Sequence, residues 1–83
     1  MQVRFLELDV DTYDEKIGEY DYSKAKFITC KKIKNVAEFS KLIKQVKLLE
    51  IDDDWYRFYD YTISTRRDND SYVGMNVYVE EYV

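Results

Sequence analysis

Apolar and polar positions alternate most regularly near the C-terminus of the 83-residue chain. Within residues 71–83, the apolar side chains occupy alternate positions: Val73, Met75, Val77, Val79 and Val83. A period of two residues is typical of a β-strand with one face against a core. Residues 55–65 are equally rich in aromatic and β-branched side chains and predict a second strand. The polar residues 66–70 between the two segments predict a hairpin turn.

The pairing of these two strands predicts which side chains of the first strand face the core. We expect the core face of 55–65 to hold four large side chains: Trp55, Tyr59, Tyr61 and Ile63. The opposite face would then hold Tyr56 and Phe58, together with Tyr72, Tyr78 and Tyr82 of the second strand. Because one helix covers only one side of a sheet, several of these rings should be partly exposed, and exposed aromatic patches mark interaction sites.

The N-terminal half predicts two further strands, over residues 3–10 and 24–33. The apolar parity switches between Phe5 and Leu6, which indicates either a bulge or a strand covered on both faces. The intervening residues 11–23 form either a long loop or the tip of an extended hairpin that turns near Gly18, with Thr12-Tyr13 opposite Tyr20.

A helix is predicted over residues 36–48. Asn35 is a favourable N-cap, and Glu38 three residues later completes a capping box. One helical stripe is apolar and consists of Val36, Phe39, Leu42, Ile43, Val46 and Leu49. The opposite side carries Lys41, Lys44 and Lys47. The aspartates at 52–54 oppose the helix dipole and end the segment.

These elements predict an α+β fold of the order ββαββ, in which one helix packs on one face of a four-stranded, mainly antiparallel sheet. A chain of 83 residues supports one hydrophobic core and not two, so residues 1–83 are expected to form a single domain. No export signal or membrane-spanning apolar run is visible, which favours the cytoplasm.

Catalysis and metal binding find little support in the composition. The chain has no histidine and one cysteine, which excludes an internal disulfide and the usual zinc sites. We interpret Cys30, within a predicted strand, as a buried and inert thiol. Asp9-Val10-Asp11 begins like a calcium loop, but the later ligand positions fail, and 52–54 is interpreted as a solvated turn. We therefore expect no enzymatic activity, no cofactor and no metal.

The charges are arranged in three blocks. Residues 1–22 hold seven acids against two basic residues, 23–49 hold eight lysines against one acid, and 50–83 hold nine acids against three arginines. The basic block offers a nucleic-acid-binding alternative through six lysines: Lys31, Lys32, Lys34, Lys41, Lys44 and Lys47. A solvated helix face is favoured over that alternative, because the whole chain carries a net charge of −4 and a sequence pI of about 4.8.

The first acidic block has a more specific pattern, in which tyrosines are interleaved with five carboxylates: Asp11, Asp14, Glu15, Glu19 and Asp21. Carboxylates spaced along a rigid hairpin can imitate duplex phosphates and occupy the basic groove of a nucleic-acid-binding protein. A solvated acidic hairpin without a partner is the plainer interpretation of the same residues.

With its runs DTYDEKIGEYDY and EIDDDWY, its short length and its abundant tyrosine, the chain resembles the small acidic inhibitors of phages and mobile elements, such as anti-CRISPR proteins. The resemblance is one of composition and carries over no residue role; the basic stretch 24–47 departs from a uniform DNA mimic. It implies a protein-binding inhibitor that blocks a nucleic-acid-handling complex in the host cytoplasm. The alternatives are a small nucleic-acid-binding or regulatory module and a homodimeric interaction protein; no membrane partner is expected.

Overall fold

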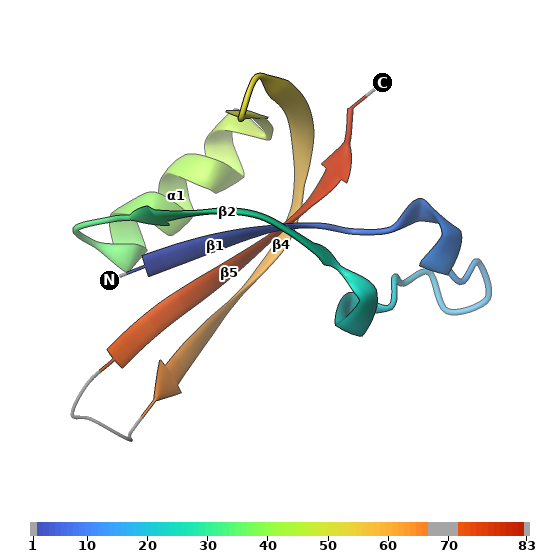
Figure 1. Cartoon of the computed structure of the whole chain (residues 1–83), viewed down its shortest axis with the longest axis horizontal. Helices are drawn as coiled ribbons and strands as arrows, with labels where there is room; N and C mark the ends of the chain where they lie inside the picture. The colour runs from blue at the N-terminus through green and yellow to red at the C-terminus, as the bar shows by residue number, and fades with distance from the viewer. Residues whose placement is uncertain (1, 67–71, 83) are drawn as a thin grey trace.

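The computed structural model describes residues 2–66 and 72–82 of the chain. This part contains the α-helix α1 (Val36–Val46) and five strands, which are β1 (Gln2–Glu7), β2 (Lys26–Lys32), β3 (Leu48–Ile51), β4 (Asp54–Arg66) and β5 (Tyr72–Glu81). The strands form one mixed sheet in the order β2-β1-β5-β4-β3, which curls strongly into a half-barrel (Figure 1). β1 and β5 run parallel, and the other neighbours are antiparallel. The expected α+β class is confirmed, whereas the expected count of four strands is wrong.

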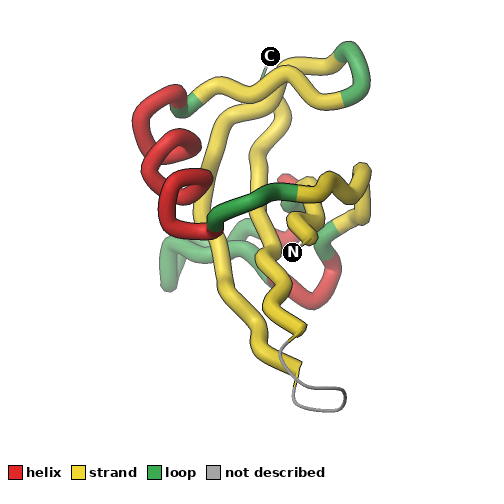
Figure 2. Tube along the Cα trace, turned by 90° about the vertical axis from the view of Figure 1, so that its left-hand side faces the viewer, coloured by secondary structure: helices red, strands yellow, loops and turns green. Residues whose placement is uncertain are grey.

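The helix joins the two edge strands of the sheet, because β2 precedes it and β3 follows it. Figure 2 shows α1 lying beside the strands, along one side of the sheet. The predicted cap is confirmed, since the side-chain oxygen of Asn35 accepts hydrogen bonds from the backbone N–H groups of Ala37 and Glu38, at 2.9 and 3.2 Å. No helix within the described residues is long and apolar enough to cross a membrane.

The strand β3 was not expected, because its leucines fit the periodicity of the preceding helix. The helix ends where Lys47 adopts a left-handed conformation with φ of 59°. The chain then pairs with β4 through a two-residue turn in which Asp52 and Asp53 have φ of 50° and 68°. Two consecutive positive φ values match the twist of a hairpin, and aspartate tolerates them better than most residues. The predicted helix is therefore confirmed over 36–46, whereas its extension to residue 48 and the assignment of Leu49 to its stripe are wrong.

Two bulges change which side chains face the core. The one expected between Phe5 and Leu6 is confirmed, with Ile28 as the extra residue in β2. A second bulge lies in β4, where Tyr59 is the extra residue between the pairs of Phe58 with Val79 and Asp60 with Tyr78. An extra residue reverses the parity of the strand on one side of the bulge.

The expected core face of β4 is consequently wrong before the bulge. Tyr56 is buried and Phe58 packs against the core, whereas Trp55 is 52% exposed. After the bulge, Tyr61 packs against the core as expected, but Ile63 is half exposed. The second strand follows its expected parity at the described side chains, with Met75, Val77 and Val79 fully buried.

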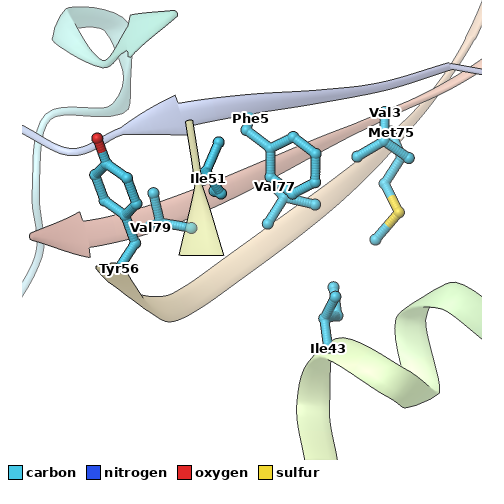
Figure 3. Close-up of a cluster of buried hydrophobic side chains, with 8 residues drawn as sticks. All are labelled: Val3, Phe5, Ile43, Ile51, Tyr56, Met75, Val77 and Val79. Atoms are coloured by element: carbon cyan, nitrogen blue, oxygen red, sulfur yellow. The ribbon is translucent and has the colours of Figure 1, made fainter. Parts of the chain in front are cut away.

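The core is a row of side chains across the sheet, closed by the helix (Figure 3). Its members from the strands are Val3, Phe5, Ile51, Tyr56, Met75, Val77 and Val79. Ile43 points toward them from α1 and has no exposed surface, while Phe39 packs edge-on against Phe5 at 6.3 Å between ring centroids. Leu42, the neighbour of Ile43 on the predicted stripe, is 54% exposed. Its assignment to the core is wrong, because Ile43 and not Leu42 is turned toward the sheet.

Some expectations fall outside the described part of the chain. These are most of the turn over 66–70, the C-terminal Val83, and the side chains of Val36, Val46, Tyr72 and Val73.

The different burial of Ile43 and Leu42 can be tested by truncation. Ile43→Ala should lower the free energy of unfolding by about 2–5 kcal/mol, because it leaves a cavity between the helix and the sheet. Leu42→Ala should change it by no more than about 0.5 kcal/mol. Urea unfolding of both variants measures these values, and equal losses would contradict the placement of the helix.

Candidate functional site

The residues between β1 and β2 form a folded segment instead of a free loop. We call residues 9–24 the acidic segment. It contains two 3₁₀ turns, Val10–Thr12 and Tyr22–Lys24, and a small hairpin in which Asp14 bridges Glu19. Gly18 has φ of 69° at the turn, as the extended-hairpin interpretation requires. The turn near Gly18 is confirmed, but the extended hairpin is not, because an isolated bridge and two 3₁₀ turns occupy the segment between β1 and β2.

Three aspartates hold the backbone of the acidic segment. Asp9, Asp14 and Asp21 each accept a hydrogen bond from the N–H two residues later, at 2.9, 2.9 and 3.0 Å. Such turns are the usual local role of aspartate. The Ser23 hydroxyl and N–H also lower the pKa of Asp21, which keeps this carboxylate charged.

A cluster of tyrosine rings attaches the acidic segment to the sheet. We call Tyr13, Tyr20, Tyr22, Tyr59 and Tyr78 the tyrosine cluster. Ring centroids are 4.9 Å apart for Tyr13 and Tyr20, 5.2 Å for Tyr20 and Tyr59, and 4.6 Å for Tyr22 and Tyr78. Each such pair contributes about 0.5–1.5 kcal/mol beyond the area that it buries. Because Tyr59 and Tyr78 belong to β4 and β5, the cluster braces the acidic segment against the sheet face opposite the core.

Two hydroxyl groups extend this bracing. The Tyr20 hydroxyl donates to Oε1 of Glu80 at 2.7 Å, and the Tyr22 hydroxyl donates to Oδ2 of Asp60 at 3.4 Å. Burial, followed by the hydrogen bond to Glu80, raises the pKa of Tyr20 to about 12. Burial, followed by the negative charge of Asp60, raises the pKa of Tyr22 to about 12.

The five acidic candidates all lie exposed on this braced segment: Asp11, Asp14, Glu15, Glu19 and Asp21. Figure 1 shows the segment and α1 at opposite ends of the molecule. Within the described residues, the side-chain carboxylates of Asp11, Glu15 and Glu19 are engaged in no hydrogen bond or ion pair. These three are therefore available to a partner, while Asp14 and Asp21 also hold the fold.

An acid-lined hollow of about 460 Å³ lies at the base of the acidic segment. Its lining consists of Glu7, Leu8, Asp9, Val10, Tyr20, Lys26, Glu80 and Glu81. Sequence reasoning missed Glu7, Glu80 and Glu81 as site residues. They come together because the ends of β1 and β5 are parallel neighbours, with Glu7 paired to Val79. No local pattern predicts that pairing, since 72 residues separate Glu7 from Val79 in the sequence.

The expected aromatic patch does not form. Tyr56 is buried, Phe58 packs against the core, and Tyr78 is stacked under Tyr22. Tyr82 is 48% exposed, with the Arg57 guanidinium 5.8 Å from its ring centroid. The side chain of Tyr72 lies outside the described part. The acidic segment covers Tyr78 through the Tyr22 ring, on the face where an open aromatic surface was expected.

The six lysines are exposed but divided between two places. Lys31 and Lys32 lie on the edge strand β2, and Lys34 precedes the helix. The other three lie on or directly after α1, whose 11 residues span about 16 Å. The ammonium of Lys44 lies 5.1 Å from the centroid of the Tyr61 ring. We expected this side chain to point away from the sheet, and that expectation is wrong.

Cys30 is exposed on β2, and its expected burial is wrong. β2 is an edge strand in which only Ile28 and Thr29 are partly buried, so Cys30 lies outside the core. Among the described residues, no group of three or more cysteine, aspartate or glutamate side chains is arranged to hold a metal ion.

Comparisons of the chain with protein-family models, with curated proteins and with solved structures found no match. The candidate site therefore stands on its own geometry.

Deprotonation of the tyrosine cluster should destabilise the fold at alkaline pH. The pKa values of Tyr20 and Tyr22 are raised from 10.0 to about 12 in the folded chain. Their neutral hydroxyl groups therefore contribute to the free energy of unfolding, and this contribution is fully present below pH 10. That contribution is lost as the pH rises from about 10 to about 12. Urea unfolding across this range measures the loss. A variant with Tyr20→Phe and Tyr22→Phe should show a smaller pH dependence, and an unchanged dependence would contradict the assignment.

Proposed function

We propose that this chain is a non-catalytic inhibitor that binds a basic surface of a nucleic-acid-handling protein through its acidic segment. One observation carries the proposal: the carboxylates stand on a segment that the tyrosine cluster holds against the sheet. A flexible acidic loop would lose conformational entropy on binding, whereas a braced one has already lost it.

The charge of the acidic segment supports a basic partner. Residues 9–24 contain six acids against Lys16 and Lys24, and Glu80 and Glu81 add negative charge at the base. Complementary charge increases the rate of association and selects against acidic partners. A protein groove that normally holds nucleic-acid phosphates has the complementary charge, and a bound inhibitor would exclude its substrate.

The acid-lined hollow supplies a pocket for one cationic side chain of that partner. A guanidinium group is planar and binds carboxylates through two parallel hydrogen bonds, so it suits Glu80 and Glu81 better than an ammonium does. Tyr20 also lines the hollow, and an aromatic ring attracts a guanidinium group. We infer that an arginine of the partner occupies this hollow.

The compositional resemblance to phage-encoded inhibitors narrows the proposal to an anti-defence role against a host complex such as a CRISPR effector. A nucleic-acid-binding or regulatory module is the second candidate. It is favoured by the exposed lysines at the start of the helix and on the edge strand, namely Lys31, Lys32 and Lys34. The division of the lysines between two places weakens it.

A tagged pull-down from host lysate, with and without nuclease, separates the two candidates. The inhibitor proposal expects a defined nucleic-acid-handling protein that stays bound after nuclease treatment. If the recovered material is lost on nuclease treatment, the inhibitor proposal is overturned. The nucleic-acid-binding candidate, which uses the lysines, is then favoured.

Charge reversal then tests the surface itself. Glu15→Lys with Glu19→Lys should reduce recovery of the partner at least about tenfold, because favourable charge pairs become repulsive. The matched control, Glu38→Lys with Glu50→Lys, changes the net charge equally at exposed glutamates on α1 and β3, outside the acidic segment and the acid-lined hollow. It should leave recovery within about twofold. Equal losses in both variants would attribute binding to net charge and contradict the proposed surface.

A further inference from the structure

A second hollow has the opposite charge from the first. It has a volume of about 400 Å³ and is lined by Lys44, Lys47, Leu48, Arg57, Phe58 and Tyr82. We call it the basic hollow. It lies where the end of α1 meets β3, β4 and the residue that follows β5. Its volume is within the range of small-molecule pockets in proteins, about 300–1,000 Å³.

Backbone geometry fixes the walls of the basic hollow. Lys47 is held in a left-handed conformation, where its N–H donates to the Ile43 carbonyl at 3.3 Å. Its own carbonyl accepts from the N–H of Phe58 at 2.8 Å, which ties the end of the helix to β4. The next residue, Leu48, is the register partner of Arg57. The side chains of the hollow are thus positioned by paired backbone.

The charge of the basic hollow comes from lysine and arginine side chains. All three of its charged lining residues, Lys44, Lys47 and Arg57, are basic. Within the described residues, none of the three forms an ion pair, and Lys44 and Arg57 instead lie over the rings of Tyr61 and Tyr82. Basic side chains that line one hollow without such pairing favour an anionic ligand.

The rest of the lining is apolar. Leu48 and Tyr82 remain 39% and 48% exposed, and Phe58 closes the side next to the core. Exposed apolar surface beside cations suits a ligand that has both an apolar body and a charged head.

We propose that the basic hollow binds a small amphipathic anion, with a compact aromatic or aliphatic body and one phosphate or carboxylate head. The body packs on Leu48, Phe58 and Tyr82, and the head interacts with Lys47 and Arg57. Inorganic phosphate lacks the apolar contact, and a neutral ring lacks the charge contact. This site is distinct from the acidic segment and does not depend on the function proposed above.

Three probes test the proposal on the unmodified chain by NMR titration. 1-Naphthyl phosphate carries both features, 1-naphthol carries only the apolar body, and inorganic phosphate carries only the charge. 1-Naphthyl phosphate should bind at least about tenfold more tightly than either of the other probes. Its largest chemical-shift changes should occur at Leu48 and Arg57. Equal affinity for 1-naphthol and 1-naphthyl phosphate, or shifts spread over all lysines, would overturn the proposal.

Charge-neutral variants provide the matched control. Lys47→Gln and Arg57→Gln should each weaken binding of 1-naphthyl phosphate about tenfold. Lys41→Gln and Lys31→Gln remove the same charge from exposed positions outside the hollow and should leave the affinity within about twofold. Circular dichroism confirms that each variant is folded. Equal weakening by all four variants would assign binding to general charge and contradict the site.

Discussion

The bulge at Tyr59 shifts the alternation of β4 by one residue, so that side chains on the even positions before it and Tyr61 after it all pack against the core. Before it, Tyr56 and Phe58 face the core; at it, the ring of Tyr59 lies on the other face, where it meets Tyr20 and Tyr22. After it, Asp60 pairs with Tyr78 and accepts the hydrogen bond of the Tyr22 hydroxyl, while Tyr61 returns to the core. The bulge thus lets two consecutive residues, Tyr59 and Asp60, contact the acidic segment while core packing continues on both sides of it.

The two charged surfaces arise from this architecture. The acidic segment is a long β1–β2 connection, and its tyrosines cover a sheet face that α1 leaves open. The helix crosses to the far edge strand on the core side, and its C-terminal end brings Lys44 and Lys47 to Arg57. Figure 1 shows the acidic segment and the helix at opposite ends of the molecule. The acidic segment and the end of the helix thus present surfaces of different charge, and each surface can bind its own ligand.

The sequence predicted the features that depend on local pattern. These include the α+β class, the Asn35 cap, the bulge at Phe5 and the turn at Gly18. Prediction from the sequence failed where a second local pattern fitted the same residues equally well. The leucines of β3 continue the helical stripe, and only the left-handed Lys47 ends it. The β4 bulge has no signature in its own residues, so Tyr56 and Phe58 were placed on the wrong face. The acid-lined hollow could not be predicted, because it depends on the parallel pairing of β1 with β5 and no local sequence pattern indicates that pairing.

The proposed binding surface requires that the acidic segment is held in one conformation before any partner binds. Backbone ¹⁵N relaxation of residues 10–24 measures whether it is. We expect order parameters close to those of a rigid backbone, about 0.85, and a clear decrease in a Tyr59→Ala variant that keeps the core intact. Values below about 0.6 in the unmodified chain would show that the segment is flexible and would contradict its bracing by the tyrosine cluster.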